Sequence, residues 1–511
     1  MSPIKRRSSK SKQKQIVENP KDFEQIKIYQ DIQVNIDQII EIFGKSPELV
    51  TKVVRESPTP YSIAFLRTLA NETRVDENIT EPLVEWGMNS SSGNNDVTSI
   101  TNHLNVSSKV KQTQTFKEIV NGMLDGCVIL FVQNSDVGLK IPVEPTPSFR
   151  KVEETKIQTV VRGPREGLVE DLDTNMSLLR RRVRNSKLRF SPMKIGKETH
   201  TKVVVTYVDD LVDQKTLDTI MERLNKIDTN KILDSGMVEE LIEDRRYTPF
   251  PTIKSTERPD IVCGEILDGR VAVLVDGSPF ALVAPVTFVS FFHIAEDYYE
   301  KFDLATFIRS IRLLAFWISL ALPATYIAVT TFHAELLPTN ILINLAAQRE
   351  GVPFPAFIEV IMMEIIFELL REAGIRMPRP IGSAISIVGA LVIGEAAVQA
   401  GLISAAMVIV VSLTAITSFI SPYYAFSGAV RMLRFVLILF AATSGFFGMA
   451  AFTIAMVIHL SNVTSIGKSY LSPIAPLSIS KLKDVLFRFP LWWDKSKFYR
   501  AFQKIKRVTR G

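Results

Sequence analysis

The sequence predicts two parts of different fold class: a soluble N-terminal α+β (mixed α/β) region of two subdomains, followed by an all-α helical membrane domain. The charge distribution is the first observation. Residues 1–312 carry 43 basic and 45 acidic side chains, residues 313–460 only 6 and 7, and residues 461–511 carry 11 and 2. The second is that long uncharged apolar runs begin only after residue 312. The third is that strand-like and helix-like patterns alternate before it.

The soluble region is expected over 26–300, with a subdomain boundary near 90–110, where Ser90–Asn95 forms a Ser-Gly-Asn-rich loop. Two β-hairpins are predicted from paired apolar runs around short turns. Their strands are 127–132 with 137–143, and 271–275 with 280–284. Further helices are expected at 35–43, 116–124, 168–183 and 211–224, and further strands at 61–69 and 202–208. Residues 1–25 are expected to form a disordered basic N-terminus, because no apolar run follows the Lys/Arg cluster as it would in a signal peptide.

Four runs within 301–460 are predicted to be full transmembrane helices, because about 20 apolar residues cross about 30 Å of hydrocarbon. They lie near 313–332, 381–400, 403–424 and 435–460. A fifth run, near 357–371, contains Glu359, Glu364 and Glu368. Its apolar part would reach only about 21 Å, so a re-entrant or interfacial acidic helix is expected there.

Basic residues predict the orientation. Lys301, Arg309 and Arg312 precede the first span, and a basic tail, 461–511, follows the last. The positive-inside rule assigns the N-terminal region and the tail to the cytoplasmic side, which requires an even number of spans. Four spans satisfy this and five do not. One group of arginines conflicts with this topology, which assigns them to the opposite side: Arg371, Arg376, Arg379, Arg431 and Arg434.

Motifs for catalysis or metal binding are not found. The five histidines are too far apart in sequence for a local metal site: His103, His200, His293, His333 and His459. Cys127 and Cys263 fit buried thiols in a reducing compartment. Two Gly-Lys-Ser triplets, 44–46 and 467–469, lack the upstream glycine of a phosphate-binding loop. The segment Arg162–Gly167 is interpreted as a turn and capping charges at the start of a basic helix, in preference to an anion site. The sequence therefore predicts no enzyme, no cofactor, no metal and no nucleic-acid partner.

Ionisable groups among apolar helices are candidates for function. Glu364 and Glu368 share a helix face, and Arg371 can pair with Glu368. They either line a cation path or form an ion-pair network that fixes the helix. Glu395 and Gln399 are also four residues apart and either pack against another helix or line a cavity.

In the last predicted span, small residues recur at a spacing of four. Ala441 with Gly445 and Ser444 with Gly448 form small-xxx-small pairs. Such pairs are typical of close helix packing, within the chain or between subunits.

Several segments resemble the A subunits of GerA-type spore germinant receptors. The resemblance runs from about 124 to 493 and is densest in DGSPFALVAPVTF (276–288), AEDYYEKF (295–302), the stretch 337–401 and SPYYAF (421–426). The motifs RGPREGLVEDLDTNMSLLRRR (162–182) and PFPTIKSTERPD (249–260) are also similar to the family.

The resemblance implies a subunit in the inner membrane of the spore that acts with a transporter-like B subunit and a lipoprotein C subunit. It implies a role in triggering germination by nutrients, through an oligomeric ion-conducting pore that the subunit forms or gates. An alternative is a secondary transporter-like or lipid-handling protein with its own substrate site, for which an inverted repeat would be expected and none is found. A third interpretation is a scaffold that only anchors the soluble region.

Overall fold

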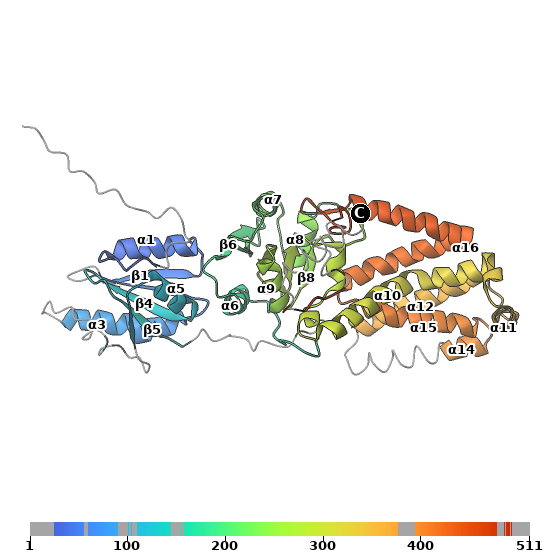
Figure 1. Ribbon diagram of the computed structural model, residues 1–511, viewed down its shortest axis with the longest axis horizontal. Coiled ribbons are helices and arrows are strands. Elements are labelled where there is room, and N and C mark those ends of the chain that lie inside the picture. The colour runs from blue at the N-terminus through green and yellow to red at the C-terminus, as the bar shows by residue number, and fades with distance from the viewer. Residues whose placement is uncertain are drawn as a thin grey trace, which may run out of the picture. The chain divides into compact units, whose positions relative to one another are not determined.

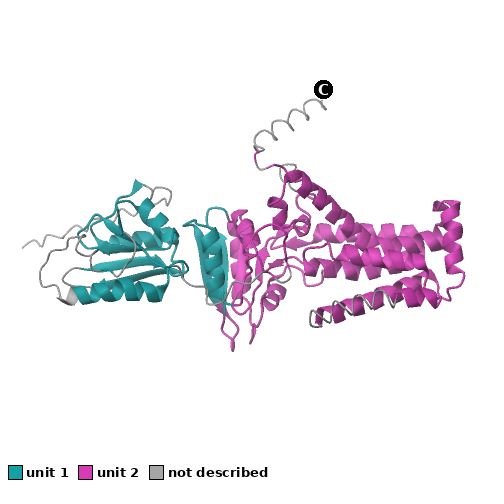
Figure 2. Cartoon of the chain, turned by 90° about the horizontal axis from the view of Figure 1, so that it is seen from below, with its two compact units in different colours: residues 1–152, 171–193, 202–211 teal, residues 153–170, 194–201, 212–511 magenta. Residues whose placement is uncertain are grey.

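The computed structural model describes residues 25–55, 60–89, 110–144, 158–376, 394–477 and 487–490, with a few isolated positions. The expected disordered N-terminus, most of the predicted span 381–400 and most of the basic tail lie outside these residues. The chain divides into two compact units, and each is taken by itself (Figure 2). Unit 1 comprises 1–152, 171–193 and 202–211, and unit 2 comprises 153–170, 194–201 and 212–511.

Unit 1 contains a five-stranded antiparallel sheet with the order β1-β2-β4-β5-β3. Its strands are β1 (Leu49–Arg55), β2 (Tyr61–Leu66), β3 (Lys111–Thr113), β4 (Cys127–Val132) and β5 (Gly138–Pro142). The predicted hairpin over 127–143 is confirmed as β4 and β5. Strands from both sides of residues 90–110 belong to this one sheet, so the expected subdomain boundary there is wrong. The Ser-Gly-Asn-rich composition at 90–95 instead marks a connection between two strands of the same sheet, β2 and β3.

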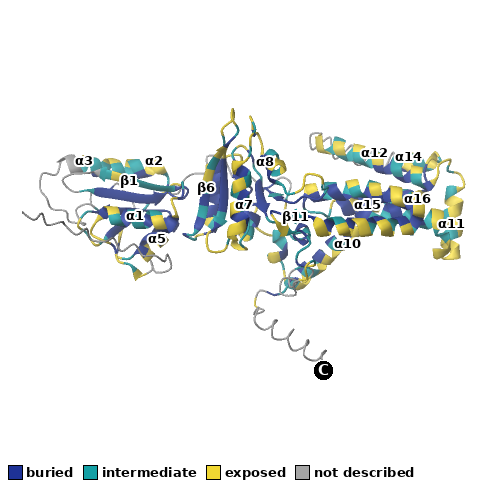
Figure 3. Ribbon diagram, turned by 90° about the horizontal axis from the view of Figure 1, so that it is seen from above, coloured by how far each residue is buried: buried dark blue, intermediate teal, exposed yellow. Residues whose placement is uncertain are grey.

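Helices cover both faces of this sheet (Figure 3). Every side chain of the central strands β2 and β4 is therefore buried, whichever face it points to. The helices of this part are α1 (Ile32–Phe43), α2 (Glu72–Val75), the π-helical turn η2 (Asp76–Thr80), α3 (Glu81–Asn89) and α5 (Phe116–Leu124). Helices α1 and α5 pack with one face, and residues Val75, Ile79 and Leu83 with the other. The predicted helices 35–43 and 116–124 are confirmed.

Unit 1 also holds α6 (Leu172–Arg182), most of β6 (Leu188–Ile195) and most of β7 (Thr201–Val208). Arg180 is fully buried on the basic helix α6 and donates from Nε to Glu48 Oε2 at 3.1 Å. A buried charge needs a partner, so this pair fixes α6 to the residues just before β1. The helix begins at Leu172 with the Asp171 side chain as N-cap. The segment Arg162–Gly167 therefore does not open it, contrary to expectation.

The α/β part of unit 2 contains the second predicted hairpin, which is confirmed as β9 (Val271–Val275) and β10 (Ala281–Ala284). Strand β8 (Lys254–Thr256) pairs with the other edge of β10. The helices here are α7 (Gln214–Asn225), α8 (Ser235–Ile242) and α9 (Pro259–Leu267), followed by the 3₁₀ turns η3 (Phe288–Phe292) and η4 (Ala295–Tyr298).

The remainder of unit 2 is a bundle of long apolar helices (Figure 1). They are α10 (Phe302–Ile327) with its π-helical end η5 (Ala328–Phe332), the turn η6 (Ala334–Leu336), α11 (Thr339–Arg349), α12 (Ala356–Arg376), α14 (Gly394–Gln399), α15 (Ala405–Ser418) and α16 (Tyr424–Asn462). A short hairpin, β11 (Thr464–Ser465) and β12 (Lys468–Ser469), follows. Among the described residues two helices are long and apolar enough to cross a membrane, 302–332 and 424–462.

Three predictions for this bundle need correction. The acidic helix α12 has 21 residues and is about 31 Å long, so it is long enough to span the hydrocarbon layer. The shorter length was predicted because charged residues interrupt the apolar run. The span predicted over 403–424 corresponds to α15, which has only 14 residues. The span predicted over 435–460 is broken at Ser444 and Gly445, whose backbone angles are not helical.

Helix α16 is in fact a hairpin of two arms, 424–443 and 446–462, as Figure 1 shows. The rings of Phe440 and Phe452 lie 5.7 Å apart, whereas twelve residues of continuous helix would separate them by about 18 Å. Phe426 and His459, at opposite ends of α16, both lie against Phe250. The uncharged run therefore contains two passes of the bundle and not one.

Candidate functional site

The acidic helix α12 presents three glutamates, each opposite an arginine of another helix. We call Glu359, Glu364 and Glu368 with their partners the acid ladder. The partners are Arg349 at the end of α11, and Arg434 and Arg431 on the first arm of α16. The ladder runs along α12 from Glu359 to Glu368, so it joins that helix to its neighbours at several levels.

The middle pair of the ladder is its most buried. Arg434 donates from Nη1 to Glu364 Oε2 at 2.7 Å, and both side chains are 0% exposed. The same guanidinium donates to the Ser319 carbonyl at 2.6 Å and to Ser319 Oγ at 2.8 Å. One charge pair thus links α10, α12 and α16 where all three are apolar. A buried pair of this kind is costly to break, because either partner alone is left uncompensated.

The pair next to it contains the predicted interaction of Glu368 with Arg371. Arg371 Nη1 lies 3.7 Å from Glu368 Oε1, but the shorter contact, 2.8 Å, comes from Arg431. Arg371 also donates to Ser418 at the end of α15 and lies over the rings of Phe367 and Phe419. Sequence spacing identified the first partner and could not identify Arg431, which is remote in sequence.

The third pair is at the other end of α12. Glu359 is fully buried, accepts from the Ser404 backbone N–H at 3.1 Å and has Arg349 Nε 3.4 Å from its other oxygen. A carboxylate at the first turn of α15 is favourable, because the unpaired N–H groups of a helix N-terminus carry positive partial charge. The sequence had marked Glu359 only as one of three acids.

Glu395 and Gln399 do not join the ladder. They lie on α14, where Gln399 donates to Glu395 at 3.2 Å and both side chains are exposed. Neither packing against a helix nor lining of a cavity is seen for this pair among the described residues.

The small residues of α16 surround the turn between its arms. Ala441, Gly445 and Gly448 are buried and Ser444 is exposed. Gly445 has a φ of 57°, and a Cβ there would lie 2.6 Å from His333 Cε1. A Cβ at Gly448 would lie 2.1 Å from the Phe440 carbonyl oxygen. The small-xxx-small pattern thus coincides with contact between two arms of one chain, whereas a sequence pattern could not distinguish this from contact between subunits.

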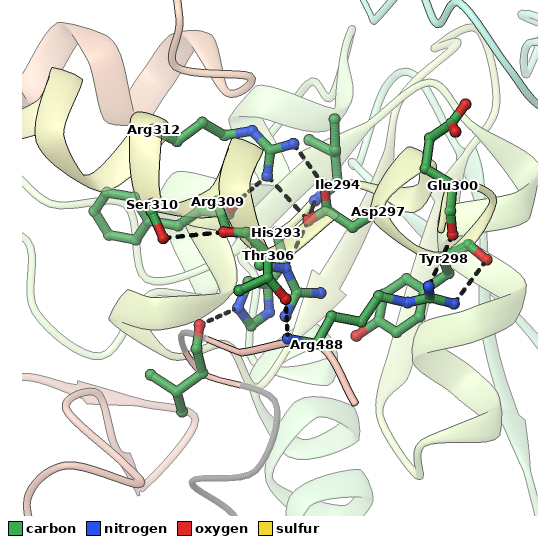
Figure 4. A network of polar contacts seen from close by, with 12 residues as sticks. His293, Ile294, Asp297, Tyr298, Glu300, Thr306, Arg309, Ser310, Arg312 and Arg488 are labelled. Atoms are coloured by element: carbon green, nitrogen blue, oxygen red, sulfur yellow. Dashed lines mark hydrogen bonds and ion pairs between the residues drawn. The ribbon is translucent and has the colours of Figure 1, made fainter. Parts of the chain in front are cut away.

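Charged residues cluster around Asp297 near the start of α10. No sequence motif had indicated this group. We call Asp297, Arg309, Arg312 and Arg488 the collar (Figure 4). Asp297 accepts from Arg309 Nε at 2.9 Å and from Arg312 Nη2 at 2.6 Å. Arg488, from beyond the bundle, donates to the Glu300 and Tyr298 carbonyls. Burial opposes ionisation of Asp297, but the two arginines outweigh it and hold its pKa below the usual value.

The two Gly-Lys-Ser triplets have structural roles. Gly44 ends α1 in the left-handed conformation with φ 66°. Gly467 lies in the β11–β12 turn, where its N–H donates to Asp244 at 2.9 Å and Lys468 pairs with Asp213 at 3.0 Å. The segment around Arg162 is likewise occupied, because its backbone N–H donates to Glu296 and Arg258 donates to the Pro164 carbonyl. An anion at these N–H groups is therefore not favoured.

These observations define a class: a protein with a mixed α/β region and a bundle of apolar helices that carries buried arginine–glutamate pairs. The chain belongs to the GerA family, since the family model described as Bacillus/Clostridium GerA spore germination protein matches residues 37–498. The resemblance to germinant receptor A subunits is thereby confirmed.

Individual relatives agree with this assignment. Spore germination protein KA of Bacillus subtilis (strain 168) is 42% identical over 480 residues, which cover 93% of this chain and 88% of the relative. Spore germination protein GerLA of Bacillus cereus is 40% identical over 382 residues, 75% of this chain and 77% of the relative. The crystal structure of the N-terminal domain of the A subunit of the Bacillus megaterium spore germinant receptor GerK3 is 28% identical, covers 52% of this chain and 98% of that chain, and has a TM-score of 0.41.

Proposed function

We propose that this chain is the membrane subunit of a nutrient germinant receptor and that it forms or gates an ion-conducting pore. In this proposal it acts as a homo-oligomer with a transporter-like B subunit and a lipoprotein C subunit in the inner membrane of the spore. Membership of the GerA family supports the role in germination. The two apolar helices support membrane insertion.

The acid ladder is the observation that carries the gating proposal. Ion pairs buried among apolar helices are costly and mark sites where a helix has discrete arrangements. Because α12 is held by arginines of α11 and α16, it cannot shift along its axis without exchanging or losing partners. A partner subunit that binds nutrient would drive such a shift only if it bound one arrangement more tightly than the other.

The contacts at one end of the bundle support a topology. The start of the first arm of α16 and the end of the second both contact Phe250, and the first also contacts Phe292 near the start of α10. We assign this end of the bundle to the cytoplasm, as the positive-inside rule requires. In this assignment Arg371 and Arg431, two of the five conflicting arginines, lie on the cytoplasmic side with Arg312.

The decisive experiment is purified protein in planar bilayers with the charge of one glutamate removed. Glu364→Gln and Glu368→Gln should alter gated single-channel currents and impair germination and cation release from spores with normal receptor levels. Glu372→Gln is the matched control, because Glu372 lies on the same helix but is 56% exposed and pairs with Arg376 of the same helix.

Three results would contradict the proposal. The first is wild-type germination and ion release in both ladder variants. The second is the absence of any current from the wild-type protein in bilayers. The third is full function after the bundle is exchanged for a generic anchor, which would indicate a scaffold.

A further inference from the structure

The connection that follows α8 exposes two arginines and a tyrosine in succession. Tyr247 is 99% exposed, and Arg245 and Arg246 are exposed as well. Within the part of the chain that the structure describes, none of these three side chains has an ion pair or a hydrogen bond. We call Arg245, Arg246 and Tyr247 the 245–247 loop. Its two unpaired guanidinium groups favour a partner that carries negative charge.

Both ends of the 245–247 loop are fixed to residues at the end of α16 or just beyond it. Before the loop, Asp244 accepts from the Gly467 N–H at 2.9 Å. After it, Thr248 Oγ1 lies 2.9 Å from His459 Nε2, and Phe250 is 2% exposed. The loop is therefore positioned before any partner arrives, which lowers the entropy cost of binding.

The contact with His459 determines the level of the loop along the bundle. His459 lies in the last turn of the second arm of α16. The exposed residues beside it are apolar: Ile454, Val457 and Ile458. The arm, 446–462, is about 25 Å long, slightly less than the roughly 30 Å of hydrocarbon in a bilayer. In the proposed topology the end of this arm, and with it Tyr247, therefore lies at the level of the cytoplasmic headgroups.

A bilayer surface with anionic phospholipid fits this combination of side chains. Arginine forms charge-assisted hydrogen bonds to phosphate oxygens, and each basic residue near such a surface adds attraction. Tyrosine is enriched at membrane interfaces, where its ring meets apolar chains while its hydroxyl stays in water. An acidic peptide would match the two charges as well, but the place of the loop beside the exposed apolar end of α16 favours lipid.

We propose that the 245–247 loop binds anionic phospholipid headgroups of the cytoplasmic leaflet and holds the α/β part of unit 2 against the membrane. Arg245 and Arg246 bind the phosphate groups, and the Tyr247 ring lies among the headgroups. This inference rests on the membrane insertion and the topology proposed above, but it does not depend on a pore.

The test uses the full chain with Tyr247→Trp, because tryptophan shares the interfacial preference of tyrosine. Its added emission is compared with that of the four native tryptophans in nanodiscs of phosphatidylcholine with increasing phosphatidylglycerol. We expect a blue shift and quenching by phosphatidylglycerol that is brominated near the headgroup. Arg245→Gln and Arg246→Gln should each weaken the apparent affinity for phosphatidylglycerol about fivefold, the factor that corresponds to one basic residue at an anionic surface.

The matched control replaces two other exposed basic residues of unit 2, Lys194→Gln and Lys231→Gln, and should leave the affinity unchanged. All of these positions are exposed, so the variants should keep the wild-type unfolding midpoint. The proposal is overturned if position 247 emits as a solvated ring with and without phosphatidylglycerol. It is also overturned if both arginine variants keep the wild-type affinity.

Native fluorescence separates failure of this inference from failure of membrane insertion. Trp317 is 44% exposed on α10, within one of the two helices long enough to cross a membrane. Brominated phosphatidylcholine should therefore quench the wild-type emission. Quenching of the native signal without quenching at position 247 would overturn the lipid contact of the loop alone. Absence of both would overturn the insertion and this inference together.

Discussion

At the scale of single residues, glutamates of the acid ladder that look alike in sequence differ in burial. Glu364 is fully buried against Arg434, whereas the Glu368 side chain is 26% exposed between Arg431 and Arg371. Glu364→Gln should therefore cost about 3–5 kcal/mol of stability, because Arg434 is left as an uncompensated buried charge. Glu368→Gln should cost clearly less. Thermal unfolding in detergent checks the order, and equal losses would contradict the assigned burial.

A second residue-scale prediction concerns pH. Burial, with the charges of Glu243 and Asp234, raises the pKa of Glu239 on α8 to about 7. The folded pKa is above the unfolded one, so the folded state loses stability as pH rises from about 4.5 to 7. Glu239→Gln should stabilise the protein by about 1–2 kcal/mol at pH 8, after allowance for partial exposure, and much less at pH 5. Glu240→Gln, at an exposed neighbouring position, is the control for unfolding midpoints at both pH values.

At the scale of elements, the hairpin of α16 is the feature with the sharpest test. Cysteines in place of Phe440 and Phe452 should be joined by a short bis-maleimide cross-linker, because the rings of these residues lie 5.7 Å apart across the two arms. Cysteines at Gly428 and Phe440 have the same sequence separation within one arm, about 18 Å apart, and should not. Cross-linking on denaturing gels distinguishes the two, and equal yields would indicate a continuous helix.

Gly445 should be the least replaceable residue of this hairpin. Its positive φ and the close approach of His333 leave no room for a side chain, so Gly445→Ala should lower the yield and unfolding midpoint of the folded protein. Gly428→Ala is the matched control in the same element, since a Cβ there meets its nearest atom, Arg431 Nη2, at an ordinary 3.7 Å. A loss of stability in both variants would point to general helix effects.

The elements also show why the sequence predicted the β-hairpins of the α/β region correctly and the helices of the bundle less well. Both β-hairpins were predictable, because apolar runs flank turns rich in Asn, Asp, Gly or Pro. Helix α12 was predicted too short because its apolar run was ended before Arg371, whereas Arg371 finds a partner on α15 and the helix continues to Arg376. The chain reversal at Gly445 could not be predicted, because glycine occurs both at close helix contacts and at turns. Only the backbone angle of Gly445 distinguishes a turn from a helix contact. Arg434 could not be assigned to Glu364, since the pairing depends on tertiary structure.

At the scale of the whole molecule, the two-pass α16 determines the accessibility of each end of the bundle. In a background without Cys127 and Cys263, we expect Ser444→Cys and Tyr247→Cys to react with impermeant thiol reagents from opposite sides of the membrane. Both positions are exposed, Ser444 at the turn and Tyr247 one residue from Thr248, which contacts His459 at 2.9 Å. Labelling of both from one side would contradict the proposed topology.

The hairpin also has a consequence for biogenesis. In the proposed topology α12 is synthesised and inserted before α16, so Glu364 is made before the arginine that compensates it. Two arms joined by a tight turn can enter the lipid together, and Arg434 on the first arm then meets Glu364 and Ser319. A chain truncated before Tyr424 would leave Glu364 and Glu368 without their partners from α16, whereas Glu359 would keep Arg349. We would expect the cell's membrane quality control to recognise such a chain by those orphaned acids.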